Sequence, residues 1–502
     1  MPLVSGPVEA GYAITETTVN TMAGDFRVRT DAGAAPRVIV LELNELCPPL
    51  LARWMAEGRL PNFQRLYDRS DVFTTLADVD DPGQLEPWIQ WYSVHTGLAF
   101  DQHRVFHLTE GARAGHADWY QLLLAAGRSV GSFASMNVAP FAAEGSFFAS
   151  DPWSENGDAY PAGLNIYNRF VGQQVREYSN TRNGLGLGGY AQFLSFMVAN
   201  GLSPSTVTMI LRQLAAERTG DRRLSYRRVA ILDRLQYDLF SRFYARTRPD
   251  LATFFLNSTA HLQHAYWRHM DPDSFTVRPD DDELAIYGDA VRFGYEAMDK
   301  LVGAFARLAD RHGARLIFMS ALSQQPFLRH ETTGGQHFHR LHDATSFLKR
   351  LGIAFDDVDP TMTHQYMVRF ASIEAASAAR QRLEALQMAD GRALFGFATR
   401  SPGETGLYFG CQISAKTDNQ AIVIDTATGE RLTFGTILYA IDAIKSGRHH
   451  PEGALWISGR HGRVHDERVS ILDVFPTLFD LLGQAQPSGD RRGRSLAARL
   501  NV

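Results

Sequence analysis

Residues 84–105 read QLEPWIQWYSVHTGLAFDQHRV, and the organisation of the chain can be worked out from this stretch. Residues 88–98 within it are predicted to be helical, with aromatic side chains on or near one face. A short apolar run, RVIVLEL (37–43), precedes the stretch and is rich in β-branched residues. Such a run is typical of a buried strand in a parallel sheet. The first elements of the chain therefore predict a strand followed by helices.

Strand-like and helix-like runs alternate over most of the remaining chain. Residues 118–135, DWYQLLLAAGRSVGSFAS, read as a helix, a glycine turn and a strand. This alternation predicts the α/β class, with a largely parallel central sheet and helices on both faces. Further runs of the buried-strand type are 71–79, 251–259, 314–323 and 453–458, and further helix candidates are 48–58, 283–313 and 342–353.

Two stretches interrupt the alternation. Residues 150–250 contain aromatic- and glycine-rich loops and several helix candidates, which predict a helical cap insert. Residues 365–445 read as strand, helix, strand and two more strands, which predict a small α+β insert. The predicted organisation is an N-terminal arm over 1–36, a core over 37–355 and 446–502, and these two inserts within the core.

The composition is that of an ordinary soluble globular protein, with 45% hydrophobic and 21% charged residues among 502. A net charge of −5 argues against broad nucleic-acid binding. No run of 18 apolar residues and no signal-peptide pattern occurs, so no membrane partner and a cytoplasmic location are expected. The two cysteines, Cys47 and Cys411, are too few for a disulfide framework and are predicted to be buried thiols.

Several phrases occur in an order shared with a known enzyme superfamily. They are GRLPN (58–62), TAHLQHAYWR (259–268), GRHHPEG (447–453) and VSILDVFPTLFDLLG (469–483), together with Trp91, Ser93, Thr96, Gly97 and His103. These phrases resemble the alkaline-phosphatase superfamily, nearest to its type I phosphodiesterase/nucleotide pyrophosphatase branch. The resemblance implies an alkaline-phosphatase-like fold and phosphoryl or sulfuryl transfer at two metal ions, usually zinc.

The residues to which the resemblance assigns this chemistry are mostly replaced. His264 and His449 match two of the expected metal ligands. The remaining ligand and nucleophile positions hold Asn44, Pro87, Ala260, Ala321 and Leu322. Two neutral imidazoles without carboxylates cannot readily hold two divalent ions close together, because the ions repel each other. Two alternatives stay open for the cofactor, either one divalent cation such as zinc or manganese at His264 and His449, or no metal.

Nearby glutamates could supply part of the missing chemistry. Glu42 and Glu45 flank Asn44, but the alternation of side chains along a strand predicts that they point to the opposite face. A shift of one residue at the nucleophile position gives Glu86, which is either a ligand, acid or base in the pocket or part of a structural turn. The expected catalytic residues are Glu86, Asn44, His264 and His449.

Substrate-binding residues are expected around the same pocket. Stacking surfaces are assigned to Trp88, Trp91 and Trp267, and polar contacts to Arg268, Gln324 and Gln325. A second histidine-rich stretch, HETTGGQHFHRLHD (330–343), follows on the same rim. It either builds a different metal site, binds an anion together with Arg329 and Arg340, or is a polar loop.

Two functions are consistent with these observations. The first is a hydrolase or transferase that acts on a phosphate ester or phosphodiester with a one-metal or metal-free site. The second is a catalytically inactive relative that binds a phosphorylated or sugar-like ligand in the same cleft. Both imply a small-molecule or glycan/phosphate-containing partner, and the sequence does not indicate an oligomeric state. Carboxylates that point toward His264 and His449 would favour the enzyme.

Overall fold

The computed structural model describes residues 36–500, apart from 80, 82, 109, 155–157, 180–185, 361–363, 398–404 and 442–443. The arm predicted over 1–36 lies outside the described residues except for Pro36. In the part of the chain that is described, no helix combines the length and the apolar character needed to cross a membrane.

In the described ranges, the core is built on a ten-stranded sheet. Strand β1 (Arg37–Leu43) lies at its centre, between β6 (Leu251–Leu256) and β7 (Ala314–Ser320), and is parallel to both. Strands β3 (Val130–Phe133) and β4 (Phe147–Ala149) extend this parallel block beyond β6. The central strands are almost wholly buried, which explains why they read as continuous apolar runs. The predicted α/β class with a largely parallel sheet is confirmed.

The last long strand of the chain returns to this sheet. Strand β19 (Glu452–Ser458) inserts between β7 and β2 (Ser70–Leu76) and is antiparallel to both. The short strands β20 (Arg463–Val464) and β21 (Val469–Ser470) pair with β2 at the edge. The predicted strand over 453–458 is therefore confirmed, one residue longer at its start.

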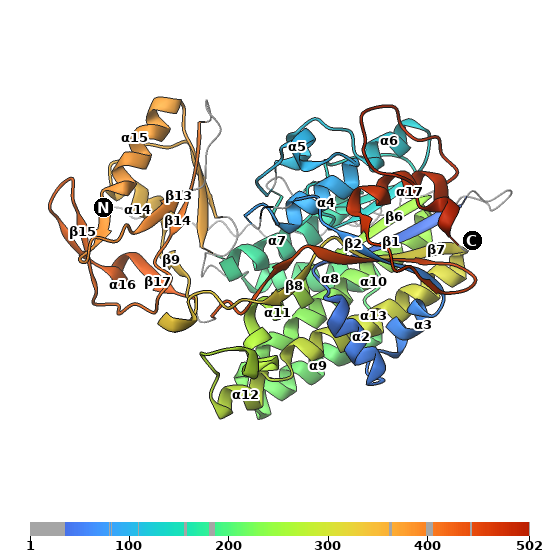
Figure 1. Cartoon of the computed structure of the whole chain (residues 1–502), viewed down its shortest axis with the longest axis horizontal. Helices are drawn as coiled ribbons and strands as arrows, with labels where there is room; N and C mark the ends of the chain where they lie inside the picture. The colour runs from blue at the N-terminus through green and yellow to red at the C-terminus, as the bar shows by residue number, and fades with distance from the viewer. Residues whose placement is uncertain are drawn as a thin grey trace, which may run out of the picture.

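Helices cover both faces of the sheet, as Figure 1 shows. One layer contains α4 (Pro87–Thr96), α6 (Trp119–Ala125) and α17 (Val474–Leu481). The other contains α2 (Pro48–Ala56), α3 (Pro61–Tyr67), α10 (Val229–Thr247) and α13 (Ala290–His312). Prolines in the first turns of α2, α3 and α4 stand where a helix leaves backbone N–H groups unbonded.

The helix predicted over 283–313 is two helices, α12 (Asp281–Tyr287) and α13. Gly288 ends the first, where its N–H bonds to the carbonyl oxygen of Leu284, and Asp289 precedes the second. The apolar period does not reveal this break, because apolar residues recur at helical spacing on both sides of it. Gly313, at φ +61°, ends α13 as predicted.

The described part of the stretch over 150–250 is largely helical, as predicted, apart from the short strand β5 (Ala159–Tyr160). It contains α7 (Asn165–Ser179), α8 (Leu187–Ala199) and α9 (Pro204–Thr219) before α10. Helix α10 packs on α13 and β6, so the end of this insert belongs to the helical layer of the core.

A small unit (residues 339–440) has its own hydrophobic cluster, which runs from Leu341 to Leu438. Its larger sheet has the order β10 (Asp357–Pro360), β11 (Gln365–Arg369), β14 (Gly406–Cys411), β13 (Phe395–Phe397). A second sheet joins β12 (Leu386–Met388), β15 (Ile422–Asp425) and β16 (Arg431–Thr433), and α15 (Ile373–Glu384) packs with them. Figure 1 shows this α+β unit beside the core.

Helix α14 (Ala344–Arg350) packs in the small unit, through Phe347 and Leu348. The sequence had assigned residues up to 355 to the core. We propose that the small unit begins near residue 339, because the hydrophobic side chains of 341–353 belong to its cluster.

Both cysteines are buried and unpaired, as predicted. Burial raises the pKa of the Cys47 thiol to about 11 and that of the Cys411 thiol to about 12. Both thiols are therefore protonated at neutral pH and are poor nucleophiles.

Candidate functional site

Glu45 is the centre of a cluster of polar side chains at the carboxyl end of β1. Its side chain is 3% exposed, and its Oε2 lies 3.0 Å from Nε2 of His264 and 3.5 Å from Nε2 of His449. One ligand atom from each of the three residues lies within 4.8 Å of the other two. This Glu45–His264–His449 group, called the Glu45 cluster below, brings one carboxylate together with both matched histidines.

His264 is held by helix α11 (Ser258–Met270) and by the segment that follows the small unit. The carbonyl oxygen of His264 accepts a hydrogen bond from the Ser446 N–H at 2.8 Å. The helix departs from helical geometry just beyond, at Tyr266, where φ is −123° and ψ is 15°. Nδ1 of His264 lies 2.9 Å from the carbonyl oxygen of Gly447. The imidazole is therefore fixed from two sides.

His449 belongs to strand β18 (Gly447–His450), which pairs antiparallel with β8 (Ser323–Pro326). Its Nδ1 lies 2.6 Å from the carbonyl oxygen of Leu85. Strand β18 therefore directs the Nε2 side of this ring toward Glu45.

The backbone contacts determine which nitrogen of each ring carries hydrogen. A carbonyl oxygen can only accept, so Nδ1 of His264 and Nδ1 of His449 both donate. In a neutral imidazole, Nε2 then presents a lone pair, and both lone pairs face the same oxygen of Glu45. This arrangement is unfavourable unless a cation, either a proton or a metal ion, lies among the three atoms. Histidines that bind metals usually have their other N–H fixed in this way.

The charges of the cluster act in the same direction. Burial would raise the pKa of the Glu45 carboxyl, but His449 and His264 beside it hold the pKa well below its usual value. For His449, burial opposes protonation, yet the carboxylates of Glu45 and Glu86 raise its pKa above the ordinary value. The cluster therefore attracts positive charge.

The two distances from Glu45 to the imidazoles fit one divalent cation. Ligand atoms about 2.0–2.1 Å from a tetrahedral zinc ion are about 3.3 Å apart, and the two distances to Glu45 Oε2 are 3.0 and 3.5 Å. Two imidazoles and one carboxylate are a known donor set for catalytic zinc. The His264 side chain is 27% exposed, so the cluster is open on one side.

Glu45 itself is held in place by a network of amides. Its φ of 59° is in the left-handed region, which non-glycine residues adopt at a cost of about 1–3 kcal/mol. Gln324 Nε2 donates to Oε2 at 2.5 Å, and Asn44 Nδ2 donates to Oε1 at 2.8 Å. Gln263 Nε2 donates to the main-chain oxygen of Glu45 at 2.8 Å, and Trp91 Nε1 donates to Asn44 Oδ1 at 2.8 Å. The carboxylate is thus oriented before any ligand binds.

Other expected polar residues lie around the cluster. Glu86 precedes α4 with its side chain 30% exposed, and its Oε2 lies 3.5 Å from Nδ1 of His449. Gln325 Nε2 donates to the main-chain oxygen of His449 at 3.0 Å. Asn44 is 2% exposed and orients Glu45 through its hydrogen bond to Oε1. Of the four expected catalytic residues, His264 and His449 therefore belong to the cluster, and Glu86 lies beside it and is partly exposed. The fourth, Asn44, is buried and does not face the open side.

The expected stacking surfaces are enclosed. Trp88, Trp91 and Trp267 are 9%, 0% and 5% exposed and belong to the hydrophobic core. Arg268 is also buried, and its Nη2 contacts Glu331 Oε1 at 2.5 Å. These four side chains support the fold around the cluster and do not present free surfaces to a ligand.

The positions where a second metal would need ligands are apolar. Ala260, Ala321 and Leu322 are at most 1% exposed. Pro87 begins α4 and has no hydroxyl group. Among the described residues, the Glu45 cluster is the one group of three histidine, cysteine or carboxylate side chains with metal-binding geometry.

The prediction that Glu45 points away from the histidines was wrong. Strand β1 ends at Leu43, and the left-handed turn at Glu45 redirects the side chain, so strand alternation no longer applies. Glu42 lies within the strand and pairs elsewhere, with His95. The one signal in the sequence was a glutamate within two residues of a strand end, next to a position where the resemblance implies a ligand.

The chain was also compared with known proteins. No protein-family model and no curated protein matches it. Similar solved structures include the wild-type alkaline phosphatase PafA, with 13% identity and a TM-score of 0.44 over 94% of this chain and all of that one. A murine ectonucleotide pyrophosphatase/phosphodiesterase 5 in an inactive form with AMP shares 9% identity and a TM-score of 0.40, over 93% of this chain and all of that one.

A phosphonoacetate hydrolase from Sinorhizobium meliloti 1021, in complex with phosphonoformate, is similar to the same extent. It shares 14% identity and a TM-score of 0.40, over 91% of this chain and 99% of that one.

Proposed function

We propose that the protein is a hydrolase that acts on a phosphate ester or phosphodiester with one divalent cation, held by Glu45, His264 and His449. One observation carries this proposal, the convergence of both Nε2 lone pairs on a carboxylate oxygen while each Nδ1 is bound to a backbone carbonyl. The sequence resemblance supplies the substrate class. The donor set favours zinc, with manganese as the alternative.

A bound cation would polarise a phosphoryl oxygen and lower the pKa of a water molecule. Glu86 is the residue best placed to exchange a proton with a substrate or water, because it is partly exposed and lies beside His449. Position 87 is a proline, so the hydroxyl nucleophile that the resemblance implies has no counterpart there. Water is therefore the attacking group in this proposal.

The second candidate is a binding protein without catalytic activity. It is favoured by the apolar side chains at Ala260, Ala321 and Leu322, which remove the second half of a two-metal site. It is also favoured by the bonds from Gln324 and Asn44, which already satisfy part of the Glu45 carboxylate. The two candidates differ in whether the cluster binds a metal.

Metal content decides between them. We expect elemental mass spectrometry of the purified protein to find near-stoichiometric zinc or manganese, and His264→Ala to lose it. The matched control is His342→Ala, which removes an exposed histidine of the small unit. A protein that binds neither metal, even after both are added, would contradict the proposal and support the binding protein.

Activity tests the role of Glu86 separately. With bis-p-nitrophenyl phosphate and p-nitrophenyl phosphate as substrates, Glu86→Ala is expected to abolish turnover while the metal is retained. Unchanged turnover in this variant would remove Glu86 from the mechanism without affecting the assignment of the metal ligands.

A further inference from the structure

A cavity of about 400 Å³ lies between the segment 329–338 and the larger sheet of the small unit. No member of the Glu45 cluster lines it, so it is a separate site. Its size is that of a small-molecule pocket. The lining residues that matter below are Arg329, His330, His337, His364, Phe397 and Tyr408.

The lining carries one permanent charge, the guanidinium of Arg329, and no aspartate or glutamate. Burial lowers the pKa of His337 and of His364, so these two imidazoles are neutral and add polar atoms but no charge. Cations just outside add to this field. Lys416 acts on His337, and Lys445 and Arg340 act on His364. A cavity surrounded by positive groups concentrates anions.

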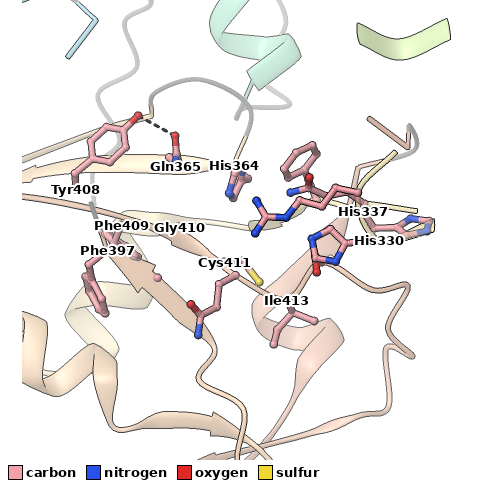
Figure 2. Close-up of a pocket in the computed structure, with 16 residues that line it drawn as sticks. His330, His337, His364, Gln365, Phe397, Tyr408, Phe409, Gly410, Cys411 and Ile413 are labelled. Carbon is pink, nitrogen blue, oxygen red and sulfur yellow. Dashed lines mark hydrogen bonds between the residues drawn. The ribbon is translucent and has the colours of Figure 1, made fainter. Parts of the chain in front are cut away.

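The lining also has two chemically different sides. Figure 2 shows Phe397 and Tyr408 on one side of the cavity and His330 and His337 on the other, with His364 between them. Aromatic faces suit a planar ring. Imidazole and guanidinium N–H groups suit the oxygens of a carboxylate or a phosphate. A molecule with a ring at one end and an anionic group at the other matches both sides.

His364 indicates that the cavity is built for a polar ligand. Its Nδ1 is buried and makes no hydrogen bond to any described residue. Its ring stacks on Phe338, with centroids 4.7 Å apart and planes 29° apart, so it cannot turn freely toward another partner. Burial lowers the pKa of His364 to about 3, so the ring is neutral. A buried unpaired nitrogen is costly, and a ligand atom would satisfy it.

Hydrogen bonds hold the walls of the cavity together. The main-chain N–H of His337 donates to the carbonyl oxygen of Ser414 at 2.7 Å, and Nδ1 of His339 donates to that of Ile413 at 2.9 Å. Gln336 forms a β-bridge with Lys445. The first two bonds fasten the end of the segment 329–338 to the residues that follow β14, so the two sides of the cavity keep their spacing.

We propose that this cavity binds a small planar anion, an aromatic carboxylate or an aryl phosphate, with its ring against Phe397 and its anionic group toward Arg329. His364 donates or accepts at its unpaired Nδ1 on the ligand's inner edge. Binding is non-covalent, because the buried Cys411 in the wall is a thiol that stays protonated. The site is independent of the proposed metal site.

Isothermal titration calorimetry of the full chain with benzoate and with phenyl phosphate tests this site. We expect saturable binding of at least one probe, and binding at least about tenfold weaker in Arg329→Gln and in His364→Phe, which keeps a ring but removes the nitrogen. Inorganic phosphate and benzyl alcohol, which carry only one half of the recognised chemistry, are expected to bind more weakly than the better probe. Comparison of the affinities for benzoate and for phenyl phosphate identifies the preferred anion.

Two controls separate this site from the metal site. Arg392→Gln removes an exposed arginine of the small unit that does not line the cavity, and should bind the probes like the wild type. His264→Ala should also bind them normally, although it loses the metal. The proposal is overturned if neither probe binds saturably, or if probe binding is lost in His264→Ala but kept in both Arg329→Gln and His364→Phe.

Discussion

Glu42 and Glu45 are buried carboxylates three residues apart, and each is paired with histidine, but their surroundings differ. Glu42 Oε1 lies 2.9 Å from Nε2 of His95, with both side chains at most 1% exposed and the ring of Trp119 close to His95. Glu42 Oε2 and His95 Nδ1 have no hydrogen-bond partner among the described residues. Glu45 instead meets two imidazoles that are 27% and 14% exposed.

The difference shows that a buried carboxylate–histidine pair is not by itself a site. The Glu42–His95 pair is closed to solvent and has one histidine, so nothing can approach it. The Glu45 cluster has two rings with fixed Nδ1 hydrogens, a shared oxygen and an open side. Convergence of lone pairs together with access distinguishes the second from the first. Four measurements test this distinction.

Glu42→Ala is expected to have the largest effect on stability. It leaves the His95 imidazole buried without its carboxylate, which should lower the free energy of unfolding by about 3–5 kcal/mol. Urea denaturation measures this loss. Metal bound per folded chain should not change. Lost metal with normal stability would place Glu42 in the metal site and remove the contrast with Glu45.

Glu45→Gln is expected to act in the opposite way. The substitution removes the one carboxylate of the cluster but keeps its size, so zinc affinity should fall at least about 100-fold, or about 2.7 kcal/mol. The loss of stability should be smaller than in Glu42→Ala, because the new amide leaves only one of the donors, Gln324 or Asn44, without its acceptor. Competition with a chromogenic chelator measures the affinity. Glu57→Gln, at an exposed ion pair with Arg53, is the control. Metal retained at full affinity would exclude Glu45 as a ligand.

A third buried carboxylate, that of Asp233, is paired with a serine, whereas Glu42 and Glu45 are paired with histidines. Ser258 Oγ donates to it at 2.5 Å, and burial raises its pKa to about 7. The folded chain therefore keeps a proton that the unfolded chain releases between about pH 4 and 7, and the stability from this group is lost as the pH rises through that range.

Asp233→Asn removes this pH dependence. The variant should be more stable than the wild type at pH 8, by on the order of 1–3 kcal/mol, and equal to it near pH 4. Urea denaturation at both pH values measures the difference. If the variant and the wild type differed in stability by the same amount at both pH values, Asp233 would not be protonated in the folded chain. Ser258 would then stabilise the charge of Asp233 as the histidines do for Glu45.

The smallest expected effect comes from the support behind Glu45. Trp91→Phe removes the N–H that orients Asn44, and should weaken zinc binding by about tenfold while lowering stability by about 1 kcal/mol. Trp88→Phe is the matched control, because it loses a similar bond, to the Phe106 carbonyl oxygen, away from the cluster. Equal zinc affinity in the two variants would limit Trp91 to a structural role.

Much of the fold could be predicted from local patterns. The central strands are apolar because helices cover both faces of the sheet, so β1 and β7 could be predicted directly from the sequence. The break at Gly288 could not be predicted, because a continuous apolar period crosses it. The assignment of 342–353 to the core also came from local pattern alone, and which cluster α14 joins depends on tertiary packing.

The site was harder to predict from the sequence than the fold was. His264 and His449 could be found by resemblance, because the phrases around them are kept. The position of the Glu45 side chain could not be predicted, because its direction depends on a left-handed backbone turn that the residue types there do not indicate. The enclosure of Trp88 and Trp91 also depends on packing between distant segments, which periodicity does not reveal.

The ribbon of β8 and β18 has a consequence for how the protein is assembled from parts. Gln324 lies opposite His449 in this ribbon, and Pro326 lies opposite Gly447. The whole of 327–446 thus enters the chain at the tip of a hairpin. The small unit therefore joins the core through one paired ribbon. A change within its cavity can leave the register that positions His449 unchanged, because that register is set by β8 and β18.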